Sequence, residues 1–165
     1  MKLGDGVEAA IHCAALLTGL QGDATLPGAA LAEYHDLSPS YLLKHLQRMV
    51  SGGILESVSG PSGGYRLARP AESITLLDIV LAVEGSAPAF RCSDLRKRGP
   101  GALDASAYLK PCGINVAMLK AEQVYRQALA ATRLSDLVKE FLDEADPRSV
   151  DHGCAFVDAR QRQPR

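Results

Sequence analysis

The sequence predicts a mainly α-helical protein with one small β-hairpin and a long helix in its C-terminal half. In the first 85 residues, four segments have helical hydrophobic spacing, and a hairpin pattern lies between the third and the fourth. From residue 113 onward, apolar residues recur at three-and-four spacing for about five turns. We therefore expect a compact N-terminal domain that carries a helical extension.

Length and composition are those of one compact domain, with or without an appendage. The chain has 165 residues, of which 47% are hydrophobic and 22% are charged. The uncharged stretch of the first helix, from Ala9 to Gly22, is shorter than the roughly 20 residues that span a bilayer. The first residues also lack the pattern of a secretory signal. We therefore expect a cytoplasmic protein with no membrane partner.

Two helices are expected before residue 35. The first spans residues 5–20, begins with Asp5 and Glu8 at the spacing of a capping box, and is apolar on almost every side. A helix of this kind is buried on more than one side. A short second helix over residues 26–34 begins near Pro27, because proline suits the first helical position.

The third helix has clear signals at both ends. Ser38 suits the N-cap, Pro39 the first position, and Gly52 with Gly53 the C-terminal end. One face is apolar and would pack against the domain. The opposite face carries the polar residues Ser40, Lys44, Gln47, Arg48 and Ser51. The pattern predicts a helix with one buried face and one face offered outward.

A hairpin and a fourth helix follow. Residues 54–67 contain two short alternating runs joined by the turn formers of residues 59–64. Thr75, with Asp78 three residues later, would cap a helix over residues 76–84. Three helices, a hairpin and a further helix are the element order of a winged helix-turn-helix domain.

This element order predicts DNA binding, since a polar helix face backed by apolar residues can enter the major groove. The glycine-rich hairpin would make the second contact, because small residues let the backbone approach the duplex. The candidate residues are Ser38, Ser40, Tyr41, Lys44, His45 and Arg48 on the helix, and Ser59, Gly60, Ser62, Gly63, Gly64, Tyr65 and Arg66 on the hairpin. The net charge is only −1, so two subunits on a symmetric duplex site are expected.

The remainder of the chain divides into three segments. Residues 86–112 are rich in proline, glycine and basic residues and would be a functional loop or a linker. The long helix that begins at residue 113 would form a dimer seam or, alternatively, cover the first helix of its own chain. Residues 146–165 are polar and are expected to be a flexible tail.

The segment Ser59 to Gly85, SGPSGGYRLARPAESITLLDIVLAVEG, resembles the bacterial winged helix-turn-helix regulator family that includes IscR, NsrR and CymR. The likeness extends upstream through Ser40-Tyr41-Leu42 and covers roughly residues 3–145. It implies a homodimeric transcription regulator with recognition helices in the major groove and wings in the minor groove. It also implies a DNA-binding domain over residues 1–85, a sensor loop over 86–112 and dimerisation helices over 113–145.

The sensor loop departs from the cluster-binding members of that family, which look to have three cysteines close together. Here the loop has Cys92 and Cys112, with nineteen residues between them, and Gly101 stands where a middle cysteine would be. Cys92 lies near the basic residues 96–98, which favour thiolate chemistry. We expect a thiol switch in which Cys92 and Cys112 form a disulfide. An iron-sulfur cluster or another metal held by these two cysteines, and cysteines that are inert or bind a ligand, are the alternatives.

Two further thiol hypotheses concern cysteines outside the loop. Cys13 resembles the single N-terminal cysteine of thiol-sensing members, or is a small apolar residue of a buried helix. His152 and Cys154 would complete a four-ligand zinc set with the loop cysteines, although their spacing matches no recognised zinc pattern.

Other classes of protein fit less well. The motif around Ser62 is similar to the setting of a nucleophilic serine, but no oriented histidine and carboxylate accompany it. A winged-helix module that binds proteins rather than DNA is the main alternative, because a fold does not fix a function. The sequence therefore favours a repressor of transcription and not an enzyme.

Overall fold

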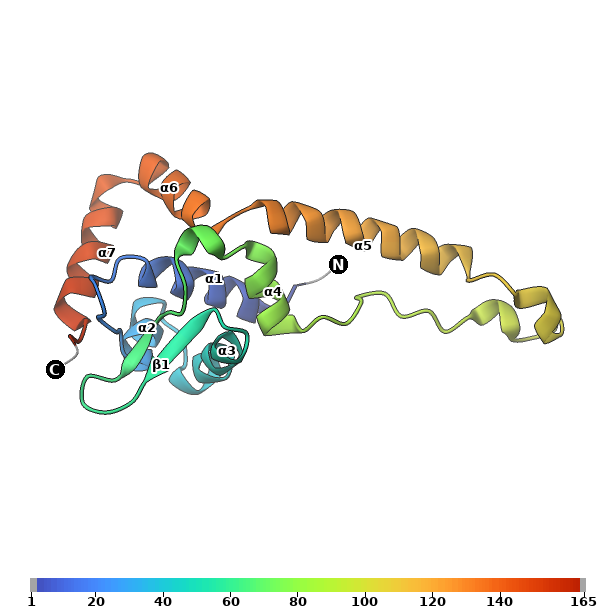
Figure 1. Ribbon diagram of the computed structural model, residues 1–165, viewed down its shortest axis with the longest axis horizontal. Coiled ribbons are helices and arrows are strands. Elements are labelled where there is room, and N and C mark those ends of the chain that lie inside the picture. The colour runs from blue at the N-terminus through green and yellow to red at the C-terminus, as the bar shows by residue number, and fades with distance from the viewer. Residues whose placement is uncertain (1–2, 164–165) are drawn as a thin grey trace.

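The computed structural model describes residues 3–163 and shows a compact head from which a loop and one long helix extend (Figure 1). The head contains α1 (Asp5–Leu17), α2 (Gly28–Tyr34), α3 (Pro39–Ser51), β1 (Leu55–Val58), β2 (Gly64–Leu67) and α4 (Leu76–Glu84). The chain continues through α5 (Gly113–Ala131), α6 (Leu134–Glu144) and α7 (Pro147–Arg160). Short 3-10 turns lie at Ala71–Ser73, Leu95–Lys97 and Ala105–Tyr108. The predicted fold class, mainly helical with a small hairpin wing, is confirmed.

The core of the head lies between α1, α3 and α4. Its largest fully buried side chains include Leu26, Leu31, Leu42, Leu46, Met49, Ile54, Leu55, Ile74, Ile79 and Leu134. In α1, Ala10, Cys13 and Ala14 are completely buried, as the all-round apolar pattern of this helix predicts. Full burial of one leucine-sized side chain contributes roughly 1.5–3 kcal/mol. This core fixes α3 with its apolar face inward.

The wing is an antiparallel pair in which Leu55 faces Leu67 and Val58 faces Gly64. An isolated bridge between Leu26 and Tyr65 places the segment before α2 against the outer side of β2. A Cβ atom at Gly64 would lie 2.6 Å from the carbonyl oxygen of Leu26, so only glycine permits this close approach. The wing is thus anchored to the body of the head along β2.

Helix ends follow some of the sequence signals and depart from others. The side chain of Thr75 accepts a hydrogen bond from the Asp78 amide, and Asp78 accepts one from the Thr75 amide, as the capping box predicts. The capping box expected at Asp5 is wrong, because α1 begins at Asp5 itself and its N-cap is Gly4. Ser38 is the N-cap of α3, but its hydroxyl pairs with that of Ser40 instead of capping a backbone amide.

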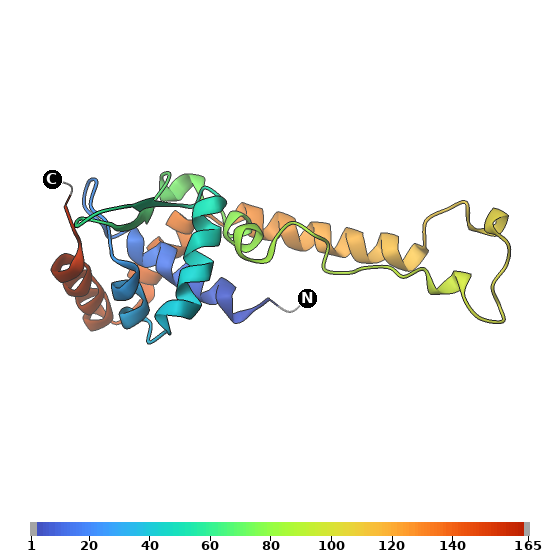
Figure 2. The ribbon, with the colours of Figure 1, turned by 90° about the horizontal axis from the view of Figure 1, so that it is seen from below.

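The loop of residues 86–112 and helix α5 form an arm that projects from the head (Figures 1 and 2). The base of the loop is tied to α5, because the Ala89 amide and the Arg126 guanidinium both bond to the buried carboxylate of Glu122. Along its length, α5 exposes large apolar side chains: Ile114, Val116, Met118, Leu119 and Val124. Within residues 3–163, no helix is long and apolar enough to cross a membrane.

The C-terminal segment differs from the expected flexible tail. Residues 147–160 form α7, which starts at Pro147 behind the cap Asp146 and packs beside α2. Val157 is buried and the ring of Phe156 lies 5.0 Å from that of Tyr34. The polar composition of this segment did not predict a helix. A few apolar residues are enough to hold α7 in place, because the surface they pack against is supplied by another part of the chain. Residues 164–165 of the predicted tail and residues 1–2 of the predicted first domain lie outside the described residues.

Candidate DNA interface and thiol site

The outward face of α3 is the first half of the candidate DNA interface. Ser40, Lys44 and Arg48 are exposed and Tyr41 is half-buried, with the Lys44 ammonium 5.0 Å from the centre of the Tyr41 ring. Arg48 also donates a 2.8 Å hydrogen bond to the carbonyl of Val83 at the end of α4. That contact orients the guanidinium and joins α3 to α4. The face therefore offers a small cationic surface held in place by the core behind it.

His45 does not belong to this face, contrary to the sequence prediction. Its side chain is 6% exposed and lies under α1, where a Cβ atom at Gly6 would collide with the imidazole ring. Burial, with help from the neighbouring cations Lys44 and Arg48, lowers the pKa of His45. Position 45 lies between the polar face and the apolar face of the helix, so the packing of α1 decides which face it joins. His45 is a core residue of the head.

The wing supplies the second half of the interface, and its residues divide into two groups. Ser59 and Gly60 at the tip are exposed. Ser62, Gly63, Gly64 and Tyr65 are half-buried, because this side of the turn faces residues 25–28. The tip is thus the exposed part of the hairpin that could contact a duplex. The start of β2 is anchored to residues 25–28 of the head.

Arg66 is less available than the sequence suggested. Its guanidinium makes ion pairs with Glu56 at 3.0 Å and with Asp23 at 3.2 Å. The hydrogen bond to Glu56 raises the pKa of Arg66. A phosphate would have to compete with two carboxylates for this side chain.

One residue near the wing was missed by sequence reasoning. Arg162, beyond α7, donates hydrogen bonds to the carbonyls of Pro61 at 3.3 Å and Gly63 at 3.1 Å. About a hundred residues separate these partners along the chain, and no local pattern signals the contact.

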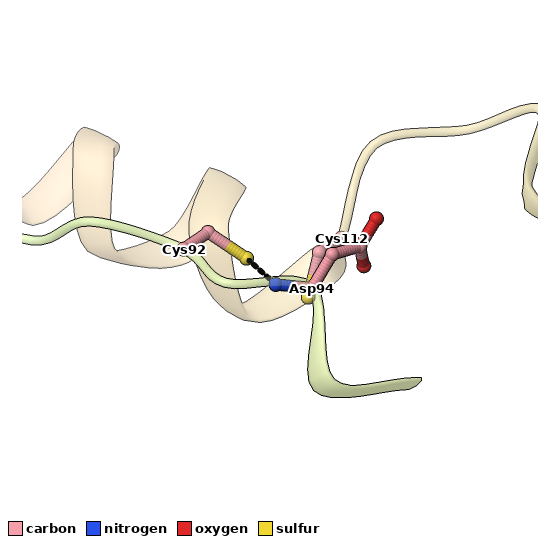
Figure 3. Close-up of side chains that lie close together, drawn as sticks. All are labelled: Cys92, Asp94 and Cys112. Carbon is pink, nitrogen blue, oxygen red and sulfur yellow. Dashed lines mark hydrogen bonds between the residues drawn. The ribbon is translucent and has the colours of Figure 1, made fainter. Parts of the chain in front are cut away.

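The arm brings Cys92, Asp94 and Cys112 together, as Figure 3 shows. The two sulfur atoms and a carboxylate oxygen of Asp94 all lie within 4.8 Å of one another. The amide of Asp94 donates to the Cys92 sulfur at 3.3 Å. Cys92 is exposed and Cys112 is partly exposed. We call these three residues the thiol site.

Arg96 and Tyr108 brace the part of the loop between Cys92 and Cys112, so that these two cysteines meet at the thiol site. Arg96 bonds to the Asp94 carboxylate at 2.7 Å and to the carbonyl of Lys110 at 2.6 Å. The Tyr108 hydroxyl donates to the carbonyl of Arg96 and accepts from the amide of Leu103. Arg96, the first residue of the basic cluster at 96–98, thus stabilises the conformation of the loop.

Electrostatics at the thiol site favour a thiolate at Cys112. This residue is the N-cap of α5, and the backbone amides of Asn115 and Ile114 lower the pKa of its thiol. The positive charge of Arg96 lowers it further. A thiolate at Cys112 would be open to oxidation, because the thiolate is the reactive form of cysteine.

The other two cysteines do not join this site. Cys13 is completely buried in the head, and burial raises the pKa of its thiol to about 12. Sensing through Cys13 is therefore disfavoured, since the thiolate is the reactive form. Cys154 lies on α7, at the opposite end of the molecule from the arm (Figure 1). The four-ligand zinc set with His152 and Cys154 is not assembled.

The thiol site does not fit an iron-sulfur cluster. It is the one group of three or more potential metal ligands with donor atoms this close among residues 3–163. Clusters commonly take four protein ligands, so the two thiols and one carboxylate leave the set short. The carboxylate is also engaged, because Asp94 pairs with both Arg96 and Lys97.

Comparison with known proteins gives a consistent result. The profile of the Rrf2 family, described as iron-dependent transcriptional regulators, matches residues 3–140. The helix-turn-helix regulator YffB of Lactococcus lactis is 31% identical over 140 residues, which are 85% of this chain and 88% of that protein.

Two solved structures have a similar fold. CymR, the global cysteine regulator of B. subtilis, aligns with a TM-score of 0.65 at 18% identity, covering 85% of this chain and 98% of that one. IscR of T. potens aligns with a TM-score of 0.64 at 20% identity, covering 91% and 96%.

Proposed function

Since the chain belongs to the Rrf2 family of DNA-binding transcriptional regulators, we propose that it is a homodimeric repressor whose DNA binding is controlled by oxidation of Cys92 and Cys112. The observation that carries the control step is the meeting of the two thiols at the first residue of α5. The family assignment supports DNA binding, and the geometry supports the finer steps below.

For DNA reading, α3 would enter the major groove and the wing tip the minor groove. Ser40, Tyr41 and Lys44 would approach base edges and phosphates, because they occupy the exposed N-terminal half of α3. Ser59 and Gly60 at the wing tip would let backbone approach the duplex closely. Each protomer has few free cations on this surface, so stable binding would require two heads on one duplex.

For dimerisation, the exposed apolar side chains of α5 would pack against a second copy of the chain. Ile114 is 68% exposed and Val124 is 65% exposed, although both have the spacing of a buried stripe. Helices with such a stripe are stable when the stripe is covered. A dimer seam along α5 would set the distance between the two DNA-binding heads.

For control, a peroxide would oxidise the pair in two steps. The Cys112 thiolate would attack one peroxide oxygen, forming a sulfenic acid and releasing water once the leaving oxygen is protonated. The Cys92 thiol would then attack the sulfenic sulfur, forming the disulfide and releasing a second water. Two electrons pass from the two thiols to the peroxide. The new bond would fix the start of α5 and shift the dimer seam, and repression would end when the heads leave the operator.

The test begins with anaerobically purified protein and a duplex selected from a randomised 30-base-pair pool. Peroxide should weaken binding by about tenfold or more, as is typical of allosteric couplings of 1–3 kcal/mol. Cys92→Ser and Cys112→Ser variants should bind as the reduced parent does and ignore peroxide. Cys154→Ser is the matched control, because it removes an exposed cysteine on α7 and should leave the response intact.

Three outcomes would contradict the proposal at different points. A peroxide response that survives in the double cysteine variant would remove the thiol switch. Visible absorbance with stoichiometric iron and sulfide would place a cluster at the thiol site instead. Failure of the protein to select any duplex at low salt would favour a winged-helix module that binds another protein.

A further inference from the structure

The sheet of the wing is wider than the hairpin. Arg162 pairs with Thr25 through two backbone hydrogen bonds, of 2.9 Å and 2.8 Å, and the adjacent Leu26 pairs with Tyr65 in the same way. The order across the sheet is therefore Arg162, residues 25–26, β2 and β1. The C-terminal segment adds a strand-like residue to an edge that would otherwise present unpaired backbone groups.

We propose that the segment of residues 161–163 is the outer edge of the wing, and that Arg162 is a positioning residue that holds the wing turn in its DNA-contacting shape. This inference rests on the DNA-binding role of the wing. It concerns neither the thiol site nor the dimer seam.

The carbonyls of the turn show how the wing would be held. Those of Pro61 and Gly63 accept from the Arg162 guanidinium, and that of Ser62 accepts from the Thr25 hydroxyl at 2.8 Å. Three consecutive carbonyls are thus fixed from the side of the sheet edge. Gly60, next to them, has a φ of 96°, and the Gly63 amide donates to its carbonyl at 2.8 Å. The contacts from the sheet edge therefore add to a single backbone hydrogen bond within the turn.

Helix α7 delivers Arg162 to this place. Arg160 pairs with Glu33 of α2, and its guanidinium lies 5.2 Å from the centre of the Phe156 ring. The Gln161 amide bonds back to the carbonyl of Val157, whose side chain is buried. Each exposed contact is weak alone, but together they leave Arg162 little freedom to swing away.

The consequence is a wing that is ordered before DNA arrives. A turn held by three carbonyl contacts loses less conformational freedom on binding than a free turn does. Removal of the Arg162 side chain should therefore loosen residues 59–63 in the free protein. The recognition helix, which lies elsewhere on the head, should be unaffected.

The first measurement is hydrogen exchange on the full-length protein without DNA. Arg162→Ala should speed exchange of the Gly63 and Tyr65 amides, which donate to the carbonyls of Gly60 and Leu26, by about tenfold. It should leave α3 unchanged, because local opening is governed by local contacts. Arg148→Ala is the matched control, since Arg148 lies on α7, the helix that precedes Arg162, and pairs with Asp146 at the N-terminus of that helix. Arg162→Lys keeps one donor group and should restore part of the protection.

The second measurement uses a duplex selected by the wild-type protein from a randomised 30-base-pair pool. Arg162→Ala should raise Kd about tenfold, lose the minor-groove part of a hydroxyl-radical footprint and keep guanine protection in the major groove. A general loss of stability would weaken both parts of the footprint equally.

The outcomes separate this inference from the proposed function. Unchanged exchange of the Gly63 and Tyr65 amides in Arg162→Ala would overturn the positioning role even if the variant binds DNA poorly, because a direct phosphate contact would then explain the loss. If the wild-type protein selects no duplex, the proposed function fails. Accelerated exchange in that case would leave Arg162 as a brace of the hairpin but overturn its role in DNA binding.

Discussion

The head and the arm of this molecule are both built from amphipathic helices, yet their apolar residues end in opposite environments. In α1, Ala10, Cys13 and Ala14 are completely buried. In α5, the buried residue is Glu122, and several large apolar side chains are exposed. The head therefore buries its apolar side chains within a single chain. The apolar side chains of the arm are as large as those of a core, but no surface of the same chain within residues 3–163 covers them.

Thiol chemistry shows the largest expected difference between the two regions. A rise of the Cys13 pKa from 9.0 to about 12 lowers its thiolate concentration about a thousandfold, so iodoacetamide at pH 8 should leave Cys13 unmodified while Cys112 reacts. Mass spectrometry of the native protein after timed alkylation would measure both rates. Comparable rates at the two sites would mean that the head opens far more readily than its packing indicates.

Core truncation should affect the head next most strongly. Leu46→Ala removes a side chain that is 1% exposed and should lower the free energy of unfolding by about 3 kcal/mol, through lost burial and the cavity left behind. Leu43→Ala, on the same helix but 45% exposed, is the control and should cost less than about 1 kcal/mol. Urea denaturation at a fixed protein concentration compares the two. Equal losses would contradict the assignment of the two faces of α3.

A charge introduced into the apolar stripe of α5 should act on the arm without unfolding the head. Val124→Lys places a charge on the proposed seam and should raise the dimer dissociation constant by about tenfold to a hundredfold, because the charge must be desolvated. Sedimentation velocity over a concentration series would measure the shift, with Gln127→Lys as the control on an exposed polar position. A dimer insensitive to Val124→Lys would place the seam elsewhere.

The smallest expected effect lies in the first turn of α4. Burial works to raise the pKa of Asp78, but hydrogen bonds from Thr75 and Arg69 outweigh it and hold the pKa below its ordinary value of 3.8. The stabilisation is therefore present above pH 3.8 and is lost as the pH falls through the lower folded-state pKa. Asp78→Asn should cost about 1 kcal/mol at neutral pH, as is usual for a lost cap.

The pH profile makes that expectation specific. Urea denaturation between pH 7 and pH 3 should show a smaller acid loss of stability in Asp78→Asn than in the wild-type protein. Glu72→Gln, nearby in the turn before α4, is the control and should keep the wild-type profile. Identical profiles for Asp78→Asn and the wild type would mean that the contacts of Asp78 do not favour its charged form.

Local signals predicted the head well. Three of these signals are the capping pair at Thr75, the glycines that end α3 and the turn formers of the wing. Each acts on residues close to it in the sequence, so its effect can be predicted from the local sequence alone. His45 shows where prediction from local signals fails, because a position between two helix faces is buried or exposed according to what packs on it. Gly6 of α1 has no side chain, and the imidazole ring of His45 occupies the space that a Cβ atom there would take.

Contacts between distant segments were predicted less well. The two loop cysteines were singled out in advance, but their approach depends on Arg96 and Tyr108, whose roles have no sequence pattern. The helix α7 was missed because its apolar residues are few. Val157 is buried and Phe156 packs against Tyr34 of α2, a contact between segments far apart in the sequence. A polar segment can therefore be ordered when the surface that receives it is made elsewhere in the chain.

The pairing of Arg162 with Thr25 also has a consequence for how the protein is made. Residue 25 leaves the ribosome well before residue 162, because 136 residues lie between them. The segments from α1 to α4 can therefore meet first, and the outer edge of the sheet is added only once residue 162 has been made. A transcript cut before the codon of residue 162 would therefore yield a head whose wing lacks its outer edge.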